Sequence, residues 1–293
     1  MGKLKTVQHF FSLVKFSHTV FAMPFALTGF VWAWHESDTG EFPWKVLLLV
    51  LLCMVFARNA AMAFNRYIDR EYDRKNRRTK NREIPAGIIT PAAALVFVVV
   101  NCILFCLTTV FINRLAFYLS FPALAVILGY SYTKRFTSLC HFILGAGLAI
   151  APTGAYIALA GEFALIPVLL SLTVLFWVGG FDILYALPDC GFDRENSLHS
   201  VPVAAGPENA LILSAVAHVV SILIALLTGV LSNRGLFYWT GCAIFAGILI
   251  YQHAAVSVSN LKRINAAFGL MNGMASVCYA IFSITDILVY HSQ

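Results

Sequence analysis

The sequence predicts an all-α membrane protein that crosses the bilayer several times. Of its 293 residues, 60% are hydrophobic and only 12% are charged, and the mean hydropathy is +0.80. A soluble domain carries about 25% charged residues, roughly twice this share. Apolar runs near the length that crosses about 30 Å of hydrocarbon recur along the chain. We therefore expect one polytopic membrane domain over residues 1–293, with nine transmembrane helices and no separate soluble domain.

The nine predicted spans follow one another with short polar connections. They cover approximately residues 16–34, 44–64, 89–111, 114–132, 139–160, 163–184, 209–231, 235–254 and 266–288. The first run is too long for the apolar region of a signal peptide and lacks a small-residue cleavage site, so we take it as a span. The seven cysteines are scattered, mostly within spans, and indicate packing residues rather than a disulfide framework.

The distribution of Lys and Arg predicts the orientation. With the N-terminus in the cytoplasm, the inner segments carry most of the 20 basic residues, including the run from Arg66 to Arg82. This asymmetry predicts a multi-pass protein of the inner (cytoplasmic) membrane whose N-terminus and polar clusters face the cytoplasm. The net charge of +6 then reflects anionic lipid head groups or a site for a polyanion, not nucleic acid.

A first acidic segment, residues 65–73, follows the second predicted span. Asn65, Asp69 and Asp73 are spaced at i, i+4 and i+8, which places them along one face of a helix. Alternating charge of this kind is also typical of a solvated, salt-bridged helix end. An amide at the membrane boundary needs partners if it is buried, and Asn65 therefore favours a functional interpretation.

A second acidic segment, residues 182–193, begins within the sixth predicted span. Asp182 is an ionisable residue at membrane depth, which by itself indicates a functional site, and Tyr185 follows one turn later. Pro188 predicts that the helix kinks or ends there, so that Asp189 and Asp193 lie on a loop or a short helix. The competing interpretation is a capped loop with solvated acids.

The two segments together indicate a metal-dependent phosphate site. Mg²⁺ takes one or two carboxylates together with phosphate oxygens. Both segments fall on the same predicted membrane face, so they suggest two Mg²⁺ ions around a diphosphate. Basic side chains on that face are suited to hold phosphate oxygens. They are Arg78, Arg82, Lys134 and Arg135.

These residues resemble the UbiA family of intramembrane aromatic prenyltransferases over essentially the whole chain. The resemblance rests on Arg58 seven residues before Asn65, on the Asp69/Asp73 pair, and on the stretches 78–82, 130–135 and 182–193. It implies helices around a central cavity, two Asp-rich motifs that bind Mg²⁺ and a polyprenyl diphosphate, and a lateral opening for the lipid tail. Two residues depart from the pattern: Arg66 follows Asn65 where many relatives have Asp, and Pro188 precedes Asp189.

The stretches 181–186 and 198–202 are similar to a quinone-pathway branch of that family. Its members are commonly called 4-hydroxybenzoate polyprenyltransferases, and some are assigned to menaquinone synthesis by the futalosine route. The resemblance thus implies Mg²⁺-dependent transfer of a polyprenyl group to 4-hydroxybenzoate or a 1,4-dihydroxy-6-naphthoate in ubiquinone or menaquinone biosynthesis. The expected partners are a polyprenyl diphosphate, an aromatic acceptor acid and membrane lipids.

The resemblance also implies roles for single residues. Asn65, Asp69 and Asp73 would bind one metal ion, and Asp189 and Asp193 the other. Asp182 would serve a metal or the acceptor, and Tyr185 would orient a phosphate or the acceptor phenol. Arg58 would pair with the acceptor carboxylate or with an internal acid.

A secondary transporter is the alternative from another functional class of protein. Nine spans with polar residues permit it. Transporters, however, usually place ionisable groups near the bilayer midplane within broken helices. Here the acids gather at one membrane boundary, which favours the enzyme.

Overall fold

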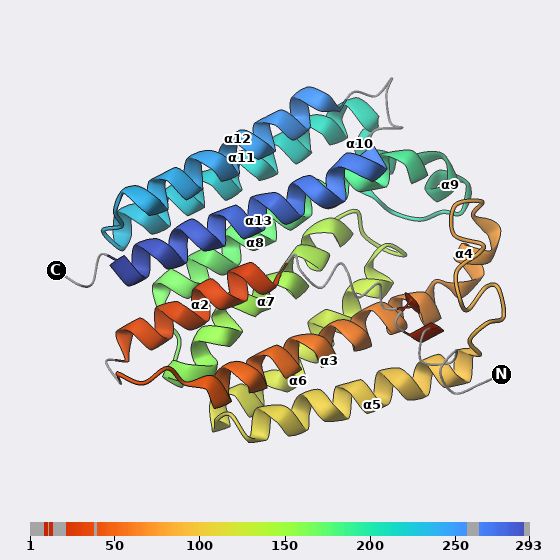
Figure 1. The fold of residues 1–293 in the computed structure, drawn as a ribbon. Helices are drawn as coiled ribbons and strands as arrows, with labels where there is room; N and C mark the ends of the chain where they lie inside the picture. The colour runs from red at the N-terminus through yellow and green to blue at the C-terminus, as the bar shows by residue number, and fades with distance from the viewer. Residues whose placement is uncertain (1–8, 11, 14–21, 38–39, 257–263, 290–293) are drawn as a thin grey trace.

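The computed structural model describes residues 9–10, 12–13, 22–37, 40–256 and 264–289, and the side chains from residue 269 onward in the last stretch. Its elements are helices throughout this part of the chain (Figure 1). The long helices are α2 (Met23–Glu36), α3 (Trp44–Ile68), α5 (Pro91–Val110), α6 (Arg114–Thr133), α7 (Cys140–Ala160), α8 (Leu165–Ala186), α11 (Pro207–Leu231), α12 (Leu236–Ala255) and α13 (Ile264–Val289). Short helices are α4 (Arg70–Lys75), η2 (Leu187–Asp189), α9 (Cys190–Glu195) and α10 (Val201–Ala205).

The protein is an integral, multi-pass membrane protein. Within the described residues, seven helices are long and apolar enough to cross a membrane. These seven coincide with seven of the predicted spans. Helices α2 and α12 occupy the positions of the other two, but they do not meet the same length and composition criteria. The start of the predicted span 16–34 lies outside the described residues, and the total of nine spans stays a prediction.

Local sequence signals explain where several helices begin and end. The Thr90 side chain accepts a hydrogen bond from the Ala93 N–H and caps α5, which has Pro91 in its first turn. Asn113 caps α6 in the same way through the Ala116 N–H. Helix α7 ends at Ala160 and is followed by Gly161, whose φ of +76° is a conformation that glycine adopts without steric cost.

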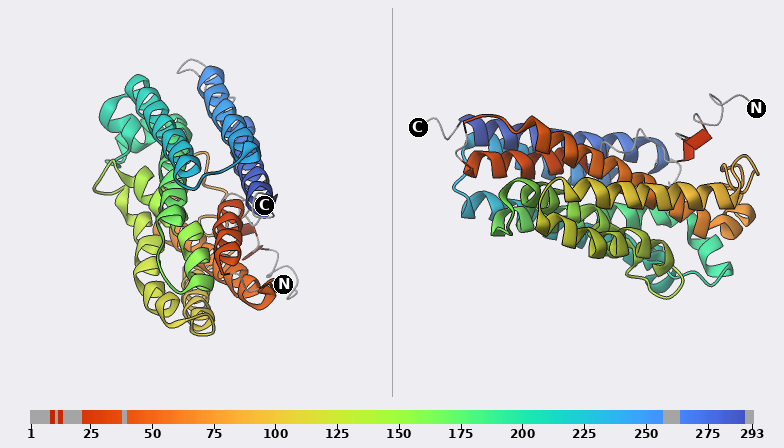
Figure 2. Two further views of the ribbon diagram at one scale, coloured as in Figure 1. Left: turned by 90° about the vertical axis from the view of Figure 1, so that its left-hand side faces the viewer. Right: turned by 90° about the horizontal axis from the view of Figure 1, so that it is seen from below.

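The long helices run side by side along a common axis in views turned by 90° (Figure 2). Helix α8 packs against α7 and α11, while α3 pairs with α5 and α12 with α13. Lipid is as apolar as a leucine side chain, so tight packing and hydrogen bonds must hold such helices together. A Cβ atom at Gly29 would lie 2.3 Å from the Pro152 carbonyl oxygen, which shows how closely α2 approaches α7.

Hydroxyl groups and aromatic rings complete this packing. The Ser214 and Ser221 hydroxyls donate to the Gly180 and Thr173 carbonyls and join α11 to α8 at two levels. The rings of Phe25 and Tyr279 stack with their centres 5.2 Å apart, and Trp177 packs against Phe25 at 5.4 Å. These contacts fill the interior between α2, α8 and α13 with side chains.

A buried acid at the end opposite the two acidic segments stabilises the start of α12. The Asp286 side chain, on α13, is 0% exposed and accepts hydrogen bonds from the Gly235 N–H at 3.0 Å and the Tyr238 N–H at 3.1 Å. The first N–H groups of a helix have no partner within it, so a residue distant in sequence acts here as the N-terminal cap.

We expect Asp286→Ala to lower the stability of the folded protein by about 1–3 kcal/mol, because the buried Tyr238 N–H and the partly buried Gly235 N–H lose their acceptor. The midpoint of thermal unfolding in one detergent measures the effect. Asp286→Asn keeps one oxygen acceptor and should lower the unfolding temperature less than Asp286→Ala does. An Ala variant that unfolds at the wild-type temperature would contradict the assigned cap.

Candidate functional site

The first acidic segment spans the break between α3 and α4. Helix α3 ends at Ile68, but the Asp69 N–H still donates to the Asn65 carbonyl at 2.9 Å and the Asp73 N–H to the Asp69 carbonyl at 2.8 Å. The i, i+4 geometry expected from the sequence therefore survives the break. The Asn65 amide donates to Asp69 Oδ2 at 3.1 Å, so these two side chains lie on one face.

The second acidic segment is divided at Pro188. Helix α8 ends at Ala186, the short helix η2 contains Pro188 in its first turn, and α9 follows from Cys190. A proline there removes no needed hydrogen bond, because the first N–H groups of a helix have no acceptor within it. Asp189 consequently ends η2 and Asp193 lies on α9, in agreement with the predicted kink.

The four basic residues singled out by the sequence each form an ion pair with a different acid. Arg78 Nη2 pairs with Asp189 Oδ2. Arg82 Nη1 lies 2.6 Å from Asp73 Oδ1, and Lys134 Nζ lies 2.8 Å from Asp193 Oδ1.

The fourth pair joins Arg135 Nη2 to Asp69 Oδ1 at 3.4 Å, and the same nitrogen donates to the Ile68 carbonyl at 2.9 Å. The formal charges of the four acids and four bases cancel.

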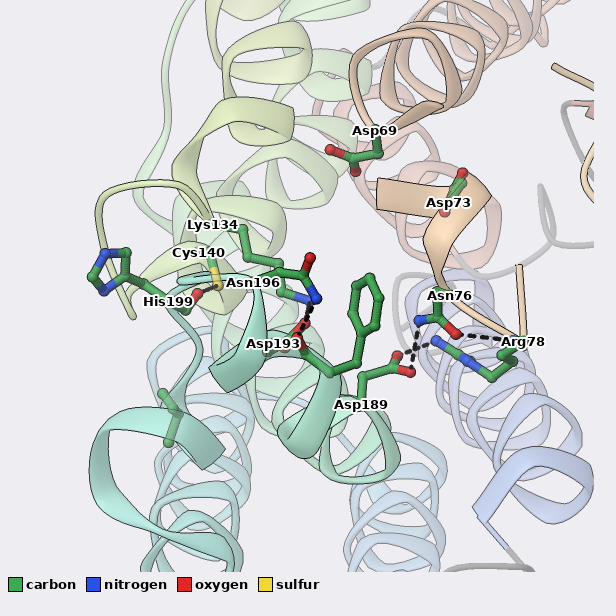
Figure 3. Close-up of polar contacts among 12 residues, drawn as sticks. Asp69, Asp73, Asn76, Arg78, Lys134, Cys140, Asp189, Asp193, Asn196 and His199 are labelled. Carbon is green, nitrogen blue, oxygen red and sulfur yellow. Dashed lines mark hydrogen bonds and ion pairs between the residues drawn. The ribbon is translucent and has the colours of Figure 1, made fainter. Parts of the chain in front are cut away.

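These pairs bring the two acidic segments together at one end of the bundle, where α4 and α9 lie (Figure 1). Asn76 and Arg78 follow the first segment, yet both contact Asp189 of the second (Figure 3). The consecutive residues Lys134 and Arg135 reach Asp193 and Asp69, one acid from each segment. The two acidic segments thus face a common region and do not point apart into solvent.

Several of these carboxylates are buried with unused hydrogen-bonding capacity. Asp73 is 6% exposed and Asp193 is 1% exposed. In each, Oδ2 has no hydrogen-bond partner among the described residues. Burial, reinforced by the Asp73 carboxylate, raises the pKa of Asp69 to about 6. Such oxygens gain from a cation that supplies the missing counter-charge.

The donor set suits Mg²⁺ that is shared with a phosphate ligand. No group of three or more His, Cys, Asp or Glu side chains converges on a metal position within the described part of the chain. The described residues thus offer no cage made of protein ligands alone. Mg²⁺ commonly needs only one or two carboxylates beside phosphate oxygens, and the unpartnered oxygens of Asp73 and Asp193 are of that kind.

A largely apolar cavity of about 620 Å³ lies among α3, α6, α7 and α8. Arg58 and Tyr130 are among the polar side chains that line it. The buried Nε of Arg58 has no hydrogen-bond partner among the described residues. This guanidinium is therefore a cation in an apolar chamber with a donor available for an anionic ligand. Arg66, the departure noted in the first acidic segment, is 5% exposed, and its Nε is also unpartnered within the described structure.

Asp182 and Tyr185 lie on the last two turns of α8. The Arg78 guanidinium stands 5.4 Å from the centre of the Tyr185 ring, so Tyr185 belongs to the same polar region as Asp189. Asp182 Oδ2 lies 2.7 Å from Nδ1 of His141, a residue that the sequence interpretation missed. The available signal was the place of His141 at the inner end of a predicted span, six residues after Arg135.

The family model of the UbiA prenyltransferase family matches residues 22–275 of the chain. A 4-hydroxybenzoate octaprenyltransferase from Paraburkholderia phytofirmans is 30% identical over 247 residues, which cover 84% of this chain and 85% of the relative. The apo structure of a UbiA homologue from Aeropyrum pernix K1 matches with a TM-score of 0.82 and 27% identity, over 92% of this chain and 98% of that one. A homologue from Archaeoglobus fulgidus, solved with DMAPP and Mg²⁺, has a TM-score of 0.70 at 19% identity and covers 96% of this chain and 99% of its own.

Removal of one partner from the Lys134–Asp193 pair should destabilise the protein more than removal of both. Lys134→Met leaves a carboxylate that is 1% exposed without its cation, which we expect to cost about 2–5 kcal/mol. The double variant Lys134→Met/Asp193→Asn should recover part of this loss. Midpoints of thermal unfolding for the two single variants and the double variant test the coupling; strictly additive shifts would contradict it.

Proposed function

Because the chain belongs to the UbiA prenyltransferase family, we propose that it transfers a polyprenyl group from a polyprenyl diphosphate to an aromatic acid of the quinone-precursor type, with Mg²⁺. The observation that carries this proposal is the set of four acid–base pairs between the two acidic segments and residues 78–135. Because each acid lies next to a base, the same region provides ligands for a metal ion and for a phosphate.

Binding of the diphosphate is proposed to exchange partners within this set. The four carboxylates would hold the metal ions, and the four cations that they release would bind the phosphate oxygens. We assign Asn65, Asp69 and Asp73 to one ion and Asp189 and Asp193 to the other. When bound, Mg²⁺ neutralises charge on the leaving diphosphate.

The cations contribute directly to departure of the diphosphate. Arg78 and Arg82 lie on the segment after α4, and Lys134 and Arg135 lie after α6, so they approach the ligand from two sides. Guanidinium groups bind phosphate oxygens with paired, charge-assisted hydrogen bonds. Such bonds strengthen as negative charge accumulates on the leaving group, which favours cleavage of the allylic C–O bond.

The apolar cavity is proposed to receive the substrates away from water. Its aliphatic and small side chains suit a prenyl chain and exclude water that would capture an allylic cation. Arg58 lines this cavity, and its buried Nε has no partner among the described residues, which supports the proposal that it pairs with the carboxylate of the aromatic acceptor. An electron-rich ring carbon then attacks the allylic carbon, and the ring loses a proton.

We further propose that the site faces the cytoplasm from the inner membrane. Both acidic segments lie at the end of the bundle that carries most of the Lys and Arg residues. The positive-inside tendency places such an end in the cytoplasm, where water-soluble aromatic acids and Mg²⁺ are accessible.

Asp69→Ala and Asp189→Ala should each abolish prenyl transfer in membranes without preventing insertion of the protein. Each variant removes a carboxylate assigned to a metal. EDTA should stop the wild-type reaction, and added Mg²⁺ should restore it. Glu71→Ala is the matched control, because Glu71 is an acid on α4 that is 60% exposed and is given no role in the site. Undiminished turnover in both Asp variants would remove them from the mechanism.

Product analysis identifies the acceptor. Membranes that contain the protein are offered 4-hydroxybenzoate or 1,4-dihydroxy-6-naphthoate with prenyl diphosphates of several lengths, and the products are measured by mass spectrometry. We expect one of the two acids to gain the mass of the prenyl group. The relative from Paraburkholderia phytofirmans, by its name, supports the first acid. Prenylation of neither acid would contradict the proposed acceptor class.

A further inference from the structure

His141 makes two specific contacts at the inner end of α7. Its side chain is 3% exposed. Nδ1 lies 2.7 Å from Asp182 Oδ2, and Nε2 accepts a hydrogen bond from the Val201 N–H at 3.2 Å. The ring therefore connects α8 with the start of α10, which follows the second acidic segment in the chain.

The contact with Val201 determines which ring nitrogen carries the proton. Val201 is the first residue of α10, and its N–H has no acceptor within that helix. A nitrogen that accepts from this N–H must present a lone pair, so Nε2 is unprotonated. The ring proton is therefore assigned to Nδ1, which donates to the Asp182 carboxylate. A doubly protonated ring would set two N–H groups against each other.

This arrangement leaves one oxygen of Asp182 available. Within the described residues, no hydrogen bond or ion pair reaches Asp182 Oδ1, and 26% of the side chain is exposed. Asp182 and Tyr185 are three residues apart on α8 and share a face of that helix. Tyr185 lies against Arg78, which pairs with Asp189. The open side of Asp182 is thus on the helix face that carries the polar region.

We propose that His141 is a positioning residue that holds Asp182 by one oxygen so that the other accepts the phenolic hydroxyl of the aromatic acceptor. This inference rests on the proposed prenyl transfer. A carboxylate that accepts from the phenol increases the electron density of the ring, which favours attack by a ring carbon. Of the two roles open to Asp182, the geometry points to the acceptor, since the four acids assigned to the metals each pair with one of the four basic residues of the phosphate site, whereas Asp182 pairs with His141 instead.

Two substitutions separate the two contacts of His141. The amide nitrogen of Asn occupies nearly the place of Nδ1, so His141→Asn retains a donor to Asp182 and loses the acceptor for Val201. The amide oxygen of Gln reaches the place of Nε2, so His141→Gln retains the acceptor for Val201 and loses the donor to Asp182. Both variants have similar size and no charge, so each is the matched control for the other.

Steady-state kinetics with each substrate varied in turn provide the test. We expect His141→Gln to lower kcat/KM for the aromatic acceptor by about tenfold to a hundredfold, since a displaced group at a reacting centre costs about that much. The KM for the prenyl diphosphate and the Mg²⁺ requirement should stay near wild type. His141→Asn should retain most of the acceptor kcat/KM. In an Asp182→Asn background, His141→Gln should have little further effect.

Three outcomes would overturn the inference. If His141→Asn lost kcat/KM for the aromatic acceptor and His141→Gln retained it, the role of the ring would be to anchor Val201. A raised Mg²⁺ requirement in His141→Gln would assign Asp182 to a metal. An equal decrease of kcat/KM for both substrates in both variants, together with lower thermal stability, would indicate a purely structural role. A wild-type protein that prenylates no aromatic acid would instead refute the proposed function, and variants are compared only once wild-type transfer has been measured.

Discussion

A carboxylate that is withdrawn from water needs a counter-charge, because the desolvation of an unpaired ion costs several kcal/mol. This constraint organises the end of the bundle where α4 and α9 lie (Figure 1). Asp73 and Asp193 are almost fully buried, and the cations that balance them come from different places: Arg82 from the loop after α4 and Lys134 from the end of α6. The Arg82 pair is local, nine residues apart, whereas the Lys134 pair connects segments that are distant in the chain. Together with Arg78–Asp189 and Arg135–Asp69, these pairs hold the two acidic segments around one region.

The same constraint explains how a site can be stable before its ligands arrive and still bind them. Four acids and four bases that neutralise one another cost less to bury than either set alone. In the proposed exchange, a diphosphate with its cations offers each group a new partner of the correct sign. In contrast, a surface salt bridge such as Arg74–Glu71, in which both side chains are about 60% exposed, contributes little to stability.

The apolar part of the protein is stabilised by interactions other than ion pairs. Helices surrounded by lipid gain no hydrophobic advantage from association, so they depend on close backbone approach and on internal hydrogen bonds. Gly29 against Pro152 and Ser214 against Gly180 supply these between α2 and α7 and between α11 and α8. Elsewhere, small residues on α3 and α7 leave the 620 Å³ cavity open. Close contacts between α2 and α7 and between α8 and α11 thus stabilise the bundle, whereas small side chains on α3 and α7 leave room for the cavity.

Sequence alone was sufficient for the all-helical, membrane-spanning class and for the positions of seven long apolar helices, because hydropathy and helix length depend on residues close together in the chain. The spacing of Asn65, Asp69 and Asp73 likewise predicted a shared face, and Pro188 predicted the division of the second acidic segment. Both are local effects of backbone geometry. Spacing could not tell that Arg78, Lys134 and Arg135 would each pair with an acid distant in the chain, nor that Asn76 would reach Asp189. It also gave no role to His141, whose partners Asp182 and Val201 are 41 and 60 residues away. Only the packing of α7 against α8 and the return of the chain at α10 decide those contacts, because they depend on which helices become neighbours in space.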